Sequence, residues 1–90
     1  MSKLFKNFVG IDISKTWFDA ALIISADPSK IIHQQFYQTS EGYNKMQQWL
    51  HDQDVSLDGD TLFCMEYSGI YTTGLVNYLV AQQAHWGVEM

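Results

Sequence analysis

The sequence lacks the basic residues with which most nucleic-acid-binding domains hold phosphate. It contains no arginine and five lysines against ten acidic residues, so its formal net charge is -5. The lysines are spread along the chain, at positions 3, 6, 15, 30 and 45. Because phosphate contacts normally come from clustered lysine and arginine, we expect this chain by itself to bind nucleic acid weakly.

Other scarcities limit the class of protein. A single cysteine excludes an internal disulfide, and its apolar neighbours predict that Cys64 is buried in the core. The longest apolar run, residues 20–24, is too short to cross a bilayer, so we expect a soluble cytoplasmic protein. Three histidines without zinc-like spacing are expected at the surface or the edge of the core: His33, His51 and His85. A length of 90 residues with 47% hydrophobic residues fits one globular domain.

The first part of the chain has the pattern of three β-strands. Residues 8–13, 16–24 and 30–37 are rich in β-branched and aromatic side chains. A tight turn at residues 14–15 and a proline-containing turn at residues 26–29 separate them. These short connections predict an antiparallel meander.

The pattern then changes to a helical period. Thr39 or Ser40 is a suitable N-cap, although Gly42 weakens the first turn. The helix is predicted to end near Asp52 on the spacing of its large apolar residues: Tyr43, Met46, Trp49 and Leu50. The aspartate-rich loop that follows, residues 52–60, lacks the residue order of a calcium loop, and we interpret it as solvated surface.

The last third predicts a strand, a helix and a further strand. The continuous apolarity of residues 61–66 favours a strand buried on both faces, as in parallel pairing. Ser68-Gly69 predicts a turn before a helix that ends near Gln83, and a new strand begins at His85. The core face of this helix is predicted to be Tyr71, Leu75, Tyr78, Leu79 and Gln82.

The order β-β-β-α-β-α-β predicts an α/β fold with a mixed sheet. The first strand is expected at the centre, between the meander and the strand of residues 61–66, because a parallel neighbour requires a crossover connection. The chain stops in or after its last strand, so we expect a truncated domain.

Two carboxylates lie in or at the end of apolar strands, and each position has an ordinary explanation. Asp12 lies within an apolar strand, where an unpaired charge is costly if buried. It could instead face solvent or cap the turn that follows. Glu66 ends the most apolar strand, and on its own it fits a strand-end residue that points to water.

Considered together, the two carboxylates predict a metal site. If their strands are parallel neighbours, Asp12 and Glu66 arrive at the carboxyl edge of the sheet, where open α/β sheets place their sites. Two nearby carboxylates repel each other unless a cation lies between them. Oxygen ligands without histidine or cysteine select Mg²⁺ or Mn²⁺. Two carboxylates form half of a two-metal phosphoryl-transfer site.

Three blocks of sequence then carry a family resemblance, and together they cover nearly the whole chain. They are FVGIDISK at residues 8–15 followed by Phe18-Asp19, TSEGY at residues 39–43 leading to Trp49-Leu50, and MEYSGIY at residues 65–71. In this order they resemble insertion-sequence transposases with a RuvC-like DEDD domain, the group that includes the Piv-type site-specific DNA invertases.

The resemblance implies a ribonuclease-H-like fold and metal-dependent DNA strand cleavage and joining with Mg²⁺ or Mn²⁺. It implies that Asp12 and Glu66 are the first two acidic residues of a tetrad. The other two, and a second domain with a serine nucleophile, are expected beyond Met90. Residues 1–90 would then be an N-terminal part, inactive alone, of a protein that binds DNA and a guide RNA.

Two other classes remain open from the residues. An actin-like or sugar-kinase ATPase half also opens with a β-hairpin, but the segment after Asp12 lacks the glycine that a phosphate loop needs. A non-catalytic interaction domain is the second alternative, because the chain is rich in tryptophan and tyrosine. An unfinished sheet would expose an edge and apolar surface, so we expect self-association into a homo-oligomer.

Overall fold

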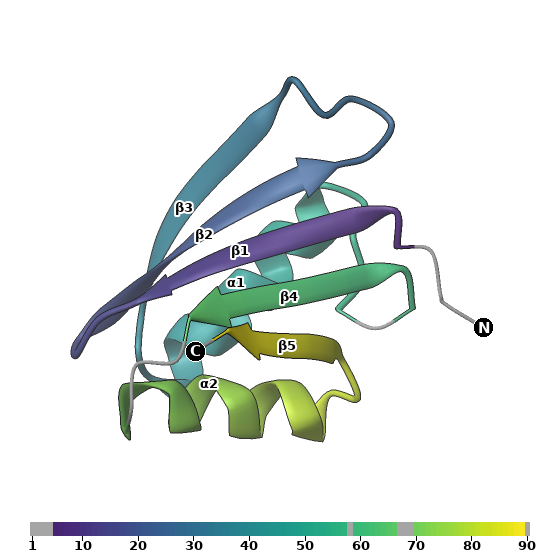
Figure 1. Ribbon diagram of the computed structural model, residues 1–90. Coiled ribbons are helices and arrows are strands. Elements are labelled where there is room, and N and C mark those ends of the chain that lie inside the picture. Colours follow the sequence, from purple (N-terminus) through teal and green to yellow (C-terminus); the bar gives the residue numbers. More distant parts are fainter. Residues whose placement is uncertain (1–4, 58, 67–69, 90) are drawn as a thin grey trace.

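Seven elements follow one another in the predicted order. The computed structural model describes residues 5–57, 59–66 and 70–89 (Figure 1). Their bounds are β1 (Asn7–Ile13), β2 (Trp17–Ile24), β3 (Ile31–Tyr37), α1 (Ser40–Asp52), β4 (Thr61–Glu66), α2 (Ile70–Ala81) and β5 (His85–Glu89). The predicted turn at Ser68-Gly69 lies outside the described residues. No described helix has the length and apolarity needed to span a membrane.

The five strands form one mixed sheet in the order β3-β2-β1-β4-β5. The hairpin pairs β1–β2 and β2–β3 are antiparallel, whereas β1–β4 and β4–β5 are parallel. Figure 1 shows β1 at the centre, with the meander on one side and β4 on the other. The predicted mixed sheet and the central position of β1 are therefore confirmed. This arrangement of five strands and two helices is that of a ribonuclease-H-like fold.

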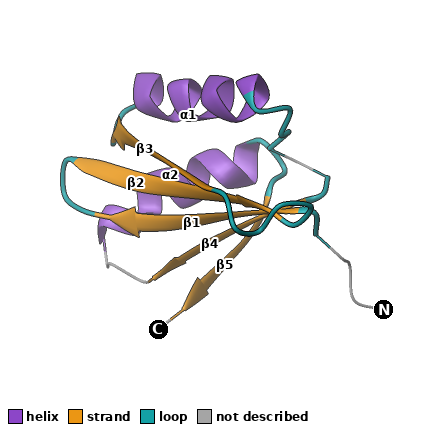
Figure 2. Cartoon of the chain, turned by 90° about the horizontal axis from the view of Figure 1, so that it is seen from above, coloured by secondary structure: helices purple, strands orange, loops and turns teal. Residues whose placement is uncertain are grey.

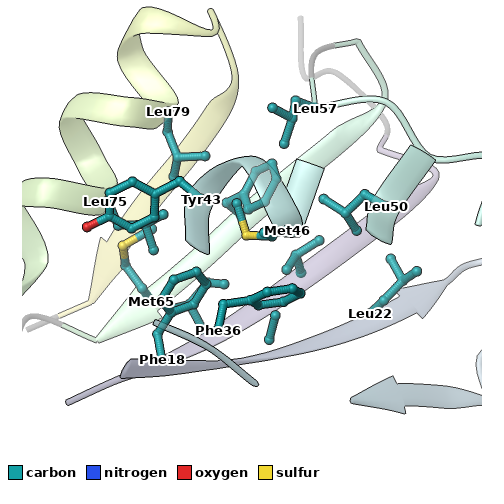
Figure 3. Packing of buried hydrophobic residues seen from close by; sticks show 14 of the residues in the cluster. Phe18, Leu22, Phe36, Tyr43, Met46, Leu50, Leu57, Met65, Leu75 and Leu79 are labelled. Atoms are coloured by element: carbon teal, nitrogen blue, oxygen red, sulfur yellow. The ribbon is translucent and has the colours of Figure 1, made fainter. Parts of the chain in front are cut away.

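The hydrophobic core lies on one face of the sheet, and both helices pack on that face (Figures 2 and 3). Every second residue of the central strands points into it, because successive side chains of a strand alternate between faces. The strands contribute Val9, Ile11, Phe18, Ala20, Leu22, Phe36, Phe63 and Met65, and the helices contribute Tyr43, Met46, Leu50, Leu75 and Leu79. One cluster of side chains therefore joins the sheet to both helices.

The opposite face of the sheet is not covered by any described helix, which overturns two predictions. β4 alternates between buried and more exposed positions instead of being buried on both faces. Cys64 is exposed rather than part of the core. Both errors have one cause: α1 and α2 pack on the same face, so a continuous apolar run in β4 has only one apolar surface to bury against.

The helices also differ in detail from their predicted faces. In α2 the buried residues are Thr72, Leu75 and Leu79, whereas Tyr71 is 39% exposed. The predicted core face of this helix was therefore wrong at two residues: Tyr71 lies beside the buried face rather than on it, and Gln82 is exposed and follows the end of α2. The loop after α1 is likewise not all solvated surface, because Val55 and Leu57 belong to the core.

The start of α1 explains the glycine that the sequence pattern disfavoured. Thr39 is the N-cap, as predicted, and its side-chain oxygen accepts a hydrogen bond of 3.0 Å from the backbone N–H of Gly42. The first turn lies so close to the preceding strand that a Cβ on Gly42 would collide with the backbone carbonyl of Tyr37. Glycine at this position therefore permits the close approach of α1 to the end of β3.

We predict that Gly42→Ala destabilises the fold by about 1–3 kcal/mol, the usual cost of overpacking. Gly87→Ala is the matched control, because a Cβ there would meet nothing within 4 Å. Alanine in a strand is ordinarily favoured over glycine by about 0.5–1 kcal/mol, so the control should be neutral or stabilising. Urea unfolding followed by circular dichroism measures both, and equal stability of the two variants would contradict the proposed close approach.

Candidate functional site

The parallel pairing of β1 with β4 brings the two predicted carboxylates to the same edge of the sheet. Gly10 pairs with Cys64 and Ile11 with Met65. Continuing this register by one residue sets Asp12 beside Glu66. Both side chains are exposed, and both line one depression on the uncovered face of the sheet. Figure 1 shows that β1 and β4 end at the same edge.

A row of small residues produces this depression. Ala21, Gly10 and Cys64 are successive partners across β2, β1 and β4, and all three line a hollow of about 550 Å³. No atom lies within 4 Å of the position that a Cβ on Gly10 would take. The hollow therefore lies directly next to Asp12 and Glu66.

A third carboxylate, Asp19, lies in the same row and was missed as a candidate site residue. It is the direct antiparallel partner of Asp12, it is exposed, and it lines the same depression. Its Oδ1 accepts a hydrogen bond of 3.2 Å from Nε2 of Gln35. The alternation of β2 contained the signal, because Phe18 and Ala20 face the core and Asp19 must then face the other way.

The local charge is negative and is not neutralised by the protein. Among the described residues, the ion pair found joins Lys6 to Asp60 at 3.8 Å, away from this row. Like charges placed directly opposite each other on neighbouring strands are destabilising. The row of Asp12, Asp19 and Glu66 therefore favours a bound cation on electrostatic grounds.

The donor atoms suit a hard divalent ion in kind, but the described residues do not complete a site. Carboxylate oxygens without histidine or cysteine are the ligands of Mg²⁺ and Mn²⁺. Within residues 5–57, 59–66 and 70–89, no three histidine, cysteine, aspartate or glutamate side chains are grouped closely enough to hold a metal ion. Asp12 is also exposed, so the cost of burial that first drew attention to it does not apply.

The three histidines lie at the surface or at the edge of the core. His33 lines the depression and is exposed, and His51 is exposed near the end of α1. His85 is half-buried and its ring contacts Phe5 with centroids 5.3 Å apart. The surface or core-edge placement predicted for the three histidines is thus confirmed.

Comparison with known families identifies the class of protein. A family model described as a transposase, of the IS110 group with a DEDD domain, matches residues 9–88. The chain belongs to this family of DEDD transposases. The match includes both Asp12 and Glu66, and it confirms the resemblance that the three sequence blocks carried. No curated protein matches the chain.

Membership of the transposase family decides between the classes that the sequence left open. The ATPase-half and interaction-domain alternatives are replaced by a DNA-processing protein of the DEDD transposase type. The ribonuclease-H-like arrangement of strands and helices agrees with that membership.

Proposed function

We propose that this transposase chain supplies Asp12 and Glu66 as two carboxylates of a metal-dependent centre for DNA strand cleavage and joining. The observation that carries the proposal is the β1–β4 register, which continues from Ile11 and Met65 to these two residues. Their shared depression on the uncovered face gives a substrate strand room to approach.

The role of the two residues follows from their chemistry. Asp12 and Glu66 would hold Mg²⁺ or Mn²⁺, which when bound stabilises the charge on the attacking and leaving oxygens in phosphoryl transfer. The two strands that carry them are paired up to Ile11 and Met65, so the backbones that lead to the two carboxylates are held at a fixed separation. Such a fixed backbone suits a site that must keep its geometry while charge develops.

We further propose that residues 1–90 are an N-terminal part of the catalytic domain and are inactive alone. The absence of a three-ligand group among the described side chains supports this, because a two-metal centre needs more carboxylates than Asp12 and Glu66. The family resemblance implies that two aspartates, a second domain with a serine nucleophile and a guide RNA complete the active assembly. We also propose the cytoplasm as the place of action, where the DNA of an insertion sequence lies.

Mutation of the carboxylates tests the metal proposal. Titration of the chain with Mn²⁺, followed by the electron paramagnetic resonance of the free ion, should show weak binding. Asp12→Asn and Glu66→Gln should each weaken it by about tenfold or more, because even residues outside the ligand shell have effects of this size. Asp27→Asn, in the turn between β2 and β3, is the control and should bind as the parent does. Mn²⁺ binding that neither Asp12→Asn nor Glu66→Gln changes would show that these two residues do not bind the metal.

The charge of the chain predicts that DNA is held mainly by other parts of the transposase. With a net charge of -5 and no arginine, the chain should bind duplex DNA weakly even at about 20 mM salt, where counterion release favours binding most. Fluorescence anisotropy of a labelled duplex measures this. Tight binding that weakens steeply as salt is added would overturn the proposal.

We also propose that the chain self-associates through α2 and β5. β5 is an edge strand, and large apolar side chains are exposed nearby: Ile70 at 80%, Val80 at 56% and Trp86 at 39%. Exposed sheet edges and apolar patches promote association between copies.

The test is the oligomeric state in solution. Sedimentation should show a dimer or larger species in the micromolar range, and the double substitution Ile70→Lys and Val80→Lys should shift it to monomer. Gln34→Lys, on the opposite edge strand β3, should leave the association unchanged. A parent chain that stays monomeric over this concentration range would contradict the proposed self-association.

A further inference from the structure

The side chain of Gln38, between β3 and α1, connects three segments of the chain. Its Nε2 donates hydrogen bonds to the backbone carbonyl of Ser14 at 3.0 Å and to that of Tyr71 at 2.8 Å. Its Oε1 accepts a hydrogen bond of 2.8 Å from the hydroxyl of Tyr43. One carboxamide thus joins the β1–β2 turn, the first turn of α2 and the core-facing side of α1.

The chemistry of these contacts requires an amide. Two carbonyl oxygens face the nitrogen, so both N–H groups are used and the reversed orientation would set oxygen against oxygen. A carboxylate in place of Gln38 would have no proton to give and would repel both carbonyls. The backbone N–H of Gln38 also donates to the carbonyl of Thr16 at 2.8 Å, which fixes the residue itself beside the turn.

The partner on α1 is held in place as well. The ring of Tyr43 packs against Phe18 and Tyr78, with centroids 5.8 Å and 5.3 Å apart. Burial raises the pKa of Tyr43, so its hydroxyl stays protonated and remains a donor at neutral pH. A Cβ on Gly74 would lie 2.5 Å from the Tyr43 hydroxyl oxygen, so glycine leaves the space that this hydroxyl occupies. Packing around the ring therefore holds the Tyr43 hydroxyl in place, and with it the hydrogen bond to Gln38.

The two carbonyls that Gln38 joins belong to the segments that leave the site strands. Ser14 follows Asp12 by two residues, and α2, which carries Tyr71, is the element after the strand that ends in Glu66. We infer that Gln38 is a positioning residue, which holds the carboxyl ends of β1 and β4 in the relative placement that a shared cation needs. This inference rests on the proposed metal function of Asp12 and Glu66.

A charge substitution separates positioning from simple electrostatics. Gln38→Glu keeps the shape of the side chain, removes both donors and adds a negative charge beside the segments that follow β1 and β4. Added negative charge alone would strengthen binding of a cation. Positioning predicts the reverse: Mn²⁺ affinity of the 90-residue chain falls by about threefold or more, a smaller effect than is usual for direct partners of metal ligands.

Two further variants keep the test decisive. Gln82→Glu makes the same change beyond the far end of α2 and should leave Mn²⁺ affinity unchanged or slightly raised. Gln38→Met removes the donors without adding charge and should weaken Mn²⁺ binding. It also replaces Gln38→Glu if circular dichroism shows that variant to be unfolded.

The outcomes distinguish this inference from the function on which it rests. Mn²⁺ binding that depends on Asp12 and Glu66, yet is equal or tighter in both folded Gln38 variants, would overturn the positioning role and leave the metal site standing. Mn²⁺ binding that is independent of Asp12 and Glu66 in the parent chain would overturn the proposed function, and the positioning role with it.

Discussion

The parallel pairing of β1 with β4 is the constraint on which the rest of the structure depends. It joins the N-terminal hairpin to the second half of the chain, and it sets Val9 beside Phe63 and Ile11 beside Met65 in the core. The same register, on the other face of the same strands, leads to Asp12 and Glu66. A shift by one residue would move the apolar side chains to the uncovered face and the carboxylates into the core, which is energetically excluded. The packing of the core therefore determines which side chains of β1 and β4 lie at the candidate site.

The two faces of the sheet differ in the side chains that they carry. One face buries large apolar side chains against α1 and α2 and supplies the stability of the fold (Figure 3). The other carries Asp12, Asp19 and Glu66 in one row beside a hollow of small residues. Such a row of like charges costs stability when no cation is present. This row of carboxylates is the feature on which the proposed cation site depends.

The sequence predicted elements well where the pattern of a segment reports on that segment alone. Alternation, turn residues and the Thr39 cap were sufficient for the order and approximate bounds of the helices and strands. Predictions failed where the answer depended on which neighbour packs on which face. Cys64 was expected in the core because its neighbours are apolar, but the sequence does not say that both helices cover one side. Asp19 was overlooked because its relation to Asp12 comes from the hairpin register, a property of two strands together.

The central claim is that Asp12 and Glu66 bind a cation together at the end of β1 and β4. Backbone amide NMR of the isotope-labelled chain with substoichiometric Mn²⁺ tests this directly, because the paramagnetic ion broadens signals according to their distance from it. The account predicts that the amides at the carboxyl ends of β1 and β4, around Asp12 and Glu66, broaden first. Broadening centred on the aspartate-rich loop after α1, or spread evenly over the exposed carboxylates, would contradict it.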